Sequence, residues 1–194
     1  MSKLILTTIA ILFIFQSEAQ ENTNNHSISL GYGLGTYYSL NKEAALNKIA
    51  VLNSPYYQLA NIKSEGQFFF SYYFSINRKI SIAIMLGYER YLGKLSDGVS
   101  NWNMRNIILM PQFNYTFSKK EKYMLYSLVG AGADYNIQRV NFYSGGIINS
   151  KTTQLLMSWQ VSPLCIRYGN KWAAFAEVGY GFKGILNVGV SLGY

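Results

Sequence analysis

The last nine residues of the chain alternate strictly between two kinds of side chain. Every second position is large and apolar or aromatic, namely Leu186, Val188, Val190, Leu192 and Tyr194. The positions between them are small or polar, namely Asn187, Gly189, Ser191 and Gly193. Because successive side chains of a strand point to opposite faces, this stretch predicts a strand with lipid on one side and a narrow polar lumen on the other.

The first 19 residues have the features of a secretory signal peptide. Lys3 precedes a twelve-residue apolar run, and small residues stand at Ser17 and Ala19. We predict cleavage between Ala19 and Gln20, which gives a signal peptide over 1–19 and one barrel domain over 20–194. The alternative, a membrane anchor, is disfavoured because the run is short for a spanning helix of about 20 residues. No cysteine follows the run, so a lipoprotein anchor is not expected.

Seven further segments alternate in the same way as the C-terminal one. They cover about residues 27–38, 64–76, 80–91, 104–117, 123–136, 152–168 and 172–182. Tilted strands of roughly 9–11 residues cross a bilayer, and bacterial single-chain barrels have an even number of strands. The chain is therefore predicted to be all-β, an eight-stranded antiparallel up-and-down transmembrane β-barrel in the bacterial outer membrane.

The predicted connections alternate between short and long. Short polar turns are expected at 77–79, 118–122 and 169–171, and longer external loops at 39–63, 92–103 and 137–151. This is the usual arrangement of periplasmic turns and extracellular loops, and it places both termini on the periplasmic side. The connection near 182–184 is predicted to be a tight external hairpin. Within the first loop, Asn41 is expected to cap a short helix that runs to residue 53. This helix would cover the mouth of the barrel, rest on the lipid headgroups, or merely fill space.

The composition is unusual for a soluble domain. Aromatic residues make up 16% of the chain and charged residues only 13%, compared with about 25% charged residues in typical soluble domains. The formal net charge is nevertheless +8. Because Lys and Arg fall mostly in the expected turns and loops of an exported chain, we expect contact with anionic outer-membrane lipids, or a solvated periphery, and no nucleic acid.

Two prolines and the single cysteine fall within the predicted strands. Pro111 and Pro163 each remove a backbone donor, so each predicts a bulge or a local break in the sheet. A bulge at Pro111 would also reverse the facing of residues 104–106. Cys165, the single cysteine, has no disulfide partner within the chain and is predicted to be a small apolar residue on the lipid face.

The C-terminal stretch 175–194 resembles the final hairpin of small outer-membrane β-barrel proteins from Bacteroidota. Ser162-Pro163-Leu164 and the segment 130–134, Gly-Ala-Gly-Ala-Asp, are similar to elements of the same group. The resemblance implies a location and a porin-like fold but no particular activity. It also implies that the barrel-assembly machinery recognises the C-terminal strand, although Tyr194 stands where phenylalanine is more common.

Three acidic residues are predicted to face the lumen, namely Glu89, Asp134 and Glu177. A carboxylate in a narrow lumen needs a partner or water, and the candidate partners are Arg105, Arg139 and Lys183. The simplest interpretation is a polar network that stiffens the barrel; the alternatives are a proton or cation path, or catalytic acids. The single histidine, His26, precedes the first predicted strand. We expect no cofactor, no metal site and no catalytic residue.

The leading functional prediction is a non-enzymatic structural or surface-interaction role. Aromatic residues of the expected loops would supply a contact surface, namely Tyr56, Tyr57, Trp102, Phe142 and Tyr143. The first alternative is a narrow channel for small or apolar solutes across the outer membrane. The second is a secreted, soluble, lipocalin-like barrel, whose apolar face would point inward.

Overall fold

The computed structural model describes residues 26–41, 59–95, 101–142 and 148–193. Its strands are β1 (His26–Leu34), β2 (Leu59–Ser75), β3 (Ile80–Leu95), β4 (Asn101–Lys119), β5 (Tyr123–Phe142), β6 (Ile148–Gly169), β7 (Trp172–Gly181) and β8 (Leu186–Gly193), with one short helix, α2 (Tyr37–Leu40). The predicted signal peptide and nearly all of the predicted helix over 41–53 lie outside the described residues. No helix in the described part of the chain has the length and apolarity to cross a membrane.

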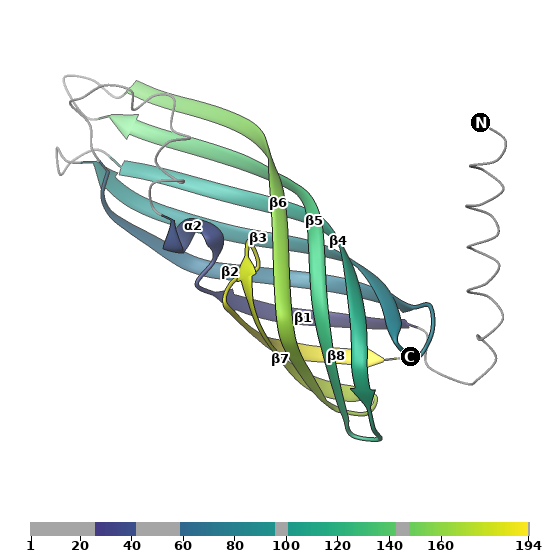
Figure 1. Ribbon diagram of the computed structural model, residues 1–194. Helices are drawn as coiled ribbons and strands as arrows, with labels where there is room; N and C mark the ends of the chain where they lie inside the picture. Colours follow the sequence, from purple (N-terminus) through teal and green to yellow (C-terminus); the bar gives the residue numbers. More distant parts are fainter. Residues whose placement is uncertain (1–25, 42–58, 96–100, 143–147, 194) are drawn as a thin grey trace, which may run out of the picture.

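The eight strands form a closed barrel in which each strand pairs with its sequence neighbours. Closure is made by β1 and β8, which run antiparallel from the pair Ser27–Gly193 to the pair Leu34–Leu186. Figure 1 shows the resulting tilted cylinder, with β1 and β8 side by side. Closure matters because it satisfies the backbone hydrogen bonds that an open sheet edge would leave unpaired. The predicted eight-stranded antiparallel barrel is confirmed.

The alternation of β8 decides which side chains face outward. Leu186, Val188 and Val190 are 42%, 43% and 52% exposed, whereas Asn187 and Ser191 are buried in the lumen. The other strands follow the same rule, so phenylalanine, leucine, isoleucine and tyrosine side chains cover the outside. An apolar exterior around a lumen that holds many polar residues is the reverse of a soluble lipocalin-like barrel.

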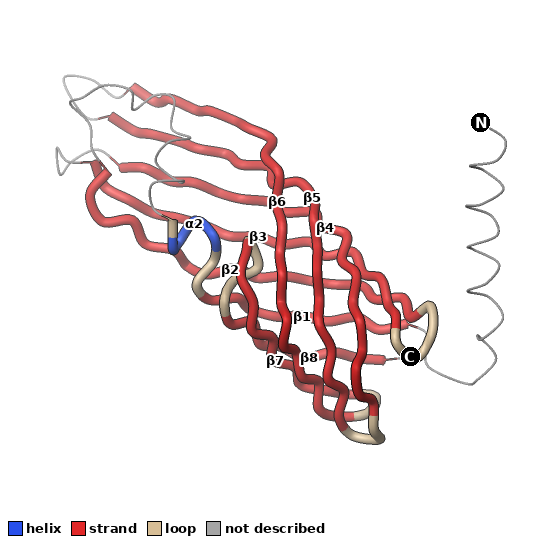
Figure 2. Tube along the Cα trace, in the orientation of Figure 1, coloured by secondary structure: helices blue, strands red, loops and turns tan. Residues whose placement is uncertain are grey.

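The strands differ greatly in length, which the sequence analysis missed. The strands β2 to β6 have 17, 16, 19, 20 and 22 residues, but β1, β7 and β8 have only 9, 10 and 8. Figures 1 and 2 show β3 to β6 extending well past the ends of β1 and β8. Most of the predicted loops 92–103 and 137–151 is therefore strand, because backbone pairing continues where the outward side chains are no longer apolar.

The two strand prolines behave differently. At Pro163 the register of β6 shifts against both β5 and β7, which is a β-bulge. At Pro111 the pairing of β4 with β5 is interrupted between Leu109 and Gln112, but no residue is gained or lost. The facing of residues 104–106 is consequently not reversed, and Arg105 points outward.

The Pro163 bulge corrects the prediction for Cys165. One extra residue in β6 reverses the side of every residue that follows it, so Cys165 faces the lumen and is fully buried. It packs there against Tyr126 and Leu128. The lipid-face prediction was wrong because simple alternation was carried through a bulge.

The buried position of Cys165 leads to a labelling prediction. A thiol enclosed in a packed lumen is inert, so we expect no reaction with a water-soluble maleimide until the barrel is unfolded in urea. The matched control is Cys165→Ser combined with Lys171→Cys, which moves the thiol to the exposed turn before β7 and should react at once. Equal rates for the two folded proteins would show that Cys165 is accessible.

Candidate functional site in the barrel lumen

The middle of the lumen is crossed by the connection between β7 and β8. Gly181 ends β7 with a φ of 140°, a conformation that favours glycine, and the chain then turns inward. Phe182 and Lys183 are both buried within the barrel. The predicted external hairpin is thus folded into the lumen, and Phe182 lies inside the barrel. The reason is the turn at Gly181, which strict alternation does not reveal.

Lys183 forms a buried ion pair at the centre of this connection. Its Nζ lies 2.5 Å from Oε2 of Glu177, and both side chains are fully buried. The hydroxyl of Tyr126 donates to the other carboxylate oxygen at 2.9 Å. The ammonium group also lies 4.2 Å from the centre of the Phe69 ring, a distance typical of a cation–π contact. The charges are therefore matched and hydrogen-bonded, as burial requires.

The backbone of the same connection is fixed by Gln160 on β6. The amide nitrogen of Lys183 donates to Oε1 of Gln160 at 2.9 Å, and Nε2 of Gln160 donates to the carbonyl oxygen of Gly184 at 3.1 Å. The amide of Phe182 donates to the carbonyl oxygen of Trp159 at 2.9 Å. These bonds hold the connection across the lumen, and we refer to residues 182–185 as the inward hairpin.

Glu89 belongs to a second, separate cluster. Its Oε1 accepts hydrogen bonds from the hydroxyls of Thr36 at 2.5 Å and Ser64 at 2.9 Å. The Thr36 hydroxyl also lies 2.7 Å from that of Tyr91. This carboxylate therefore joins the segment after β1 to β2 and β3 through neutral partners.

Asp134 belongs to a third cluster, around helix α2. The hydroxyl of Tyr38, a buried residue of that helix, donates to Oδ2 of Asp134 at 3.1 Å. Burial, together with the nearby carboxylate, raises the pKa of the Tyr38 hydroxyl, so the phenol stays protonated and can donate. On the same strand, Nδ2 of Asn136 donates to Oδ1 of Asn106 on β4 at 2.6 Å, and Nε2 of Gln138 donates to Oδ1 of Asn136 at 2.9 Å.

The three predicted lumen acids therefore have different partners. Of the candidate cations, Lys183 contacts Glu177, whereas Arg105 and Arg139 are exposed on the outside of the barrel. The sequence identified the three acids by strand alternation. It did not reveal Thr36, Tyr38 or Tyr126 as their partners, because those contacts join residues far apart in the chain.

Aromatic side chains fill the lumen beside the inward hairpin. The ring of the buried Phe182 stacks on that of Tyr37 with their centres 5.2 Å apart, and its centre also lies 5.2 Å from that of the buried Tyr38. Trp102, which was predicted to be a loop residue available for binding, is 1% exposed and faces inward from β4. It was misassigned because β4 extends to Asn101. Of the other predicted loop aromatics, Tyr56, Tyr57 and Tyr143 lie outside the described residues, as does the side chain of Phe142.

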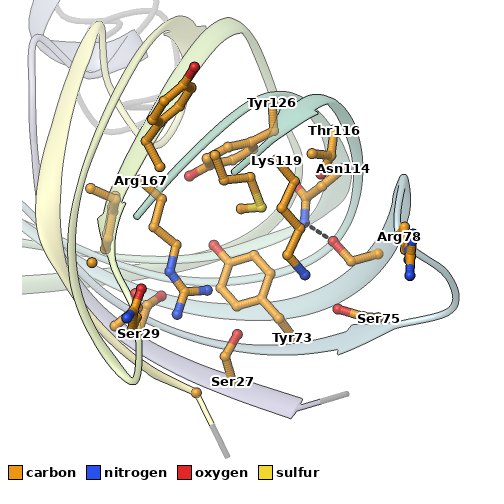
Figure 3. A pocket seen from close by; sticks show the side chains of 18 of the residues that line it. Ser27, Ser29, Tyr73, Ser75, Arg78, Asn114, Thr116, Lys119, Tyr126 and Arg167 are labelled. Carbon is orange, nitrogen blue, oxygen red and sulfur yellow. Dashed lines mark hydrogen bonds between the residues drawn. The ribbon is translucent and has the colours of Figure 1, made fainter. Parts of the chain in front are cut away.

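The turn end of the lumen holds a cavity of about 390 Å³. Five basic residues line it, namely Arg78, Lys119, Lys120, Arg167 and Lys171, together with one acid, Glu121. Figure 3 shows Arg167 and Tyr73 lying next to each other inside it. Arg167 faces the lumen because it follows the Pro163 bulge, so simple alternation could not place it there.

The single histidine of the chain lies on the first strand. His26 opens β1, and its Nδ1 lies 2.6 Å from the hydroxyl of Tyr72 rather than near a lumen acid. Within the described part of the chain, no three residues of the types His, Cys, Asp and Glu come together as a metal site. The buried charges and hydroxyls instead join strands to one another and to the inward hairpin.

No protein-family model matches the chain, and no curated protein matches it. Solved structures to which it is similar include Ail, the attachment invasion locus protein of Yersinia pestis, at 11% sequence identity and a TM-score of 0.46, covering 87% of this chain and 95% of that one. A structure of Ail with the heparin analogue sucrose octasulfate gives 13% identity, a TM-score of 0.42, and coverage of 87% and 95%. The N-terminal β-barrel domain of Pseudomonas aeruginosa OprF gives 14% identity and a TM-score of 0.43, covering 88% of this chain and 98% of that domain.

Proposed function

We propose that this chain is a bacterial outer-membrane β-barrel protein with a structural or surface-interaction role, and that it is not an enzyme. Membrane insertion is supported by the exterior, on which large apolar side chains from every strand are exposed to the surroundings. So large an apolar surface would be unfavourable in water, whereas lipid chains accommodate it. The proposed partners are the outer-membrane lipids and, through β8, the barrel-assembly machinery that the Bacteroidota resemblance implies.

The observation that carries the structural role is the inward hairpin. An eight-stranded barrel has an interior just wide enough for side chains. Here the interior also contains a segment of backbone, held by the Lys183–Glu177 pair and by Gln160. Such a filled lumen favours a rigid scaffold that presents its extended end, formed by β2 to β6, on the cell surface.

A narrow channel for small or apolar solutes is the second candidate. The observation that favours it is the cavity at the turn end, which reaches into the lumen as far as Tyr126. In this case the inward hairpin would act as a gate. The two functions differ in whether the hairpin leaves the lumen under native conditions.

Planar-bilayer recording is the test. For a scaffold with a filled lumen we expect no steady single-channel openings, because the inward hairpin and its ion pair obstruct the path. Steady, resolvable openings would support the channel instead. Heat-modifiable migration on a gel is measured on the same preparation. A sample that migrates identically with and without boiling would contradict a closed barrel in the membrane.

A further inference from the structure

At the extended end of the barrel, one outward row of paired residues is entirely apolar or aromatic. Tyr88 of β3 pairs with Ile107 of β4, which pairs with Tyr135 of β5, which pairs with Leu155 of β6. All four side chains are exposed on the outside. Two large aromatic rings in this row are typical of the boundary between lipid chains and headgroups.

Beyond this row, several outward positions are basic, although Leu92 of β3 is exposed there and Ile137 of β5 is half-buried. Arg90 of β3 is paired directly with Arg105 of β4. One row further on, Arg139 of β5 is paired directly with Lys151 of β6. Lys94 lies on the same outer part of β3. Lys63 of β2 is paired with Leu92, which lies two residues before Lys94 on β3. We call this group the basic belt; its members are Lys63, Arg90, Lys94, Arg105, Arg139 and Lys151.

The members of the basic belt are close enough to repel one another. Side chains directly opposite on antiparallel strands have Cβ atoms roughly 4.5–5.5 Å apart, and like charges there are destabilising. Arg105 and Arg139 are diagonal neighbours, because Arg105 is paired with Ile137, two residues before Arg139. The four cations Arg90, Arg105, Arg139 and Lys151 therefore form a continuous line over four adjacent strands.

Acidic residues do not neutralise this line within the described part of the chain. On the exterior of β2 to β6 beyond the apolar row, the described acid is Glu65, at a bulge in β2, and no ion pair joins it to Arg90. The Nε atom of Arg90 is also buried without a hydrogen-bond partner among the described residues. Among the described residues, the two directly opposed cation pairs are thus left without a neutralising acid.

We propose that the basic belt binds the anionic phosphate groups of lipid headgroups in the leaflet around the extended end of the barrel. The inference rests on the proposed membrane insertion. The position of the basic belt supports a lipid rather than a soluble partner, since the belt directly continues the apolar surface that would contact acyl chains. A phosphorylated lipid would place its chains on Ile107 and Leu155 and its phosphates against Arg105 and Arg139. Arginine suits this role because its guanidinium group binds phosphate oxygens in pairs.

The test compares lipids retained by the folded barrel. The protein is refolded into vesicles of phosphatidylcholine that contain lipid A as a minor component, and native mass spectrometry measures the lipid that remains bound after extraction. We expect wild-type protein to enrich lipid A over phosphatidylcholine. The double variant Arg105→Gln/Arg139→Gln should lose this enrichment by about tenfold or more, because two cations near headgroup phosphates are removed.

A matched double variant separates site binding from bulk charge. Lys119→Gln/Lys120→Gln removes the same charge at the opposite end of the barrel, where both side chains are exposed, and should leave the enrichment intact. Equal loss in both double variants would overturn the assignment to the belt. Arg105→Lys/Arg139→Lys should retain part of the enrichment, because it keeps the charge but loses paired hydrogen bonding.

The remaining outcomes distinguish this proposal from membrane insertion itself. A wild-type protein that shows heat-modifiable migration in the vesicles but does not enrich lipid A would overturn the belt proposal and leave insertion standing. Failure to insert into any vesicle would overturn both. Displacement of lipid A by millimolar-scale inorganic phosphate, or heparin binding without lipid A enrichment, would show that the belt recognises a soluble anion, and would overturn the lipid assignment.

Discussion

Replacing Lys183 with methionine is expected to lower the free energy of unfolding by about 3–5 kcal/mol, because it leaves the Glu177 carboxylate buried without its counter-charge. Both side chains are fully buried, and the Tyr126 hydroxyl alone would remain to donate to the carboxylate. Methionine keeps most of the length of lysine, so packing beside Phe69 is largely preserved. The measurement is urea-induced unfolding in vesicles, followed by tryptophan fluorescence.

Two further variants show whether the orphaned charge causes the loss. Lys119→Met removes an exposed lysine at the end of β4 and is expected to change stability by less than about 0.5 kcal/mol. The double variant Lys183→Met/Glu177→Gln removes both charges and should recover most of the lost stability, since neutral groups replace the pair. A double variant as unstable as Lys183→Met would instead attribute the loss to packing.

The alternation of side chains was enough to predict the barrel and the lumen acids. It follows from the period of a strand, and it holds for Glu89, Asp134 and Glu177 because no register shift separates each of them from the apolar residues beside it. The same reasoning failed at Cys165 and Arg167, which follow the Pro163 bulge. Proline indicates that a strand is irregular, but it does not tell a bulge from the simple interruption found at Pro111.

The inward hairpin and the extended strands could not be predicted in this way. Gly181 and Gly184 permit a turn, but only the contacts with Gln160 and Glu177, on other parts of the barrel wall, make that turn point into the lumen. In β3 to β6, outward arginines and asparagines replaced the apolar residues, so the segments resembled loops although their backbones remain paired. The basic belt lies in this region and is recognised from the strand register, which the sequence does not specify.

A methyl group at Gly33 is expected to destabilise the folded barrel by about 2–3 kcal/mol, because there is no space for it beneath the inward hairpin. A Cβ atom at this position would overlap the backbone carbonyl oxygen of Lys183 and would lie 2.6 Å from Oδ1 of Asn187. Backbone cannot rotate away as a side chain can, so the Gly33→Ala variant must lift the hairpin. This movement would also pull Lys183 from Glu177.

The matched control is Gly31→Ala, two residues earlier on the same face of β1. The new methyl group would meet the ring ends of Phe69 and Phe175, which can turn aside, so we expect a loss of about 1 kcal/mol. Both changes restrict the unfolded chain equally, and this contribution cancels in the comparison. Urea unfolding gives the stabilities, and planar-bilayer recording shows whether lifting the hairpin in Gly33→Ala opens a path that Gly31→Ala keeps closed. Equal losses of unfolding free energy and identical recordings would mean that the inward hairpin does not pack against Gly33. The two variants should differ only if the new methyl group at position 33 meets rigid backbone, whereas the one at position 31 meets side chains.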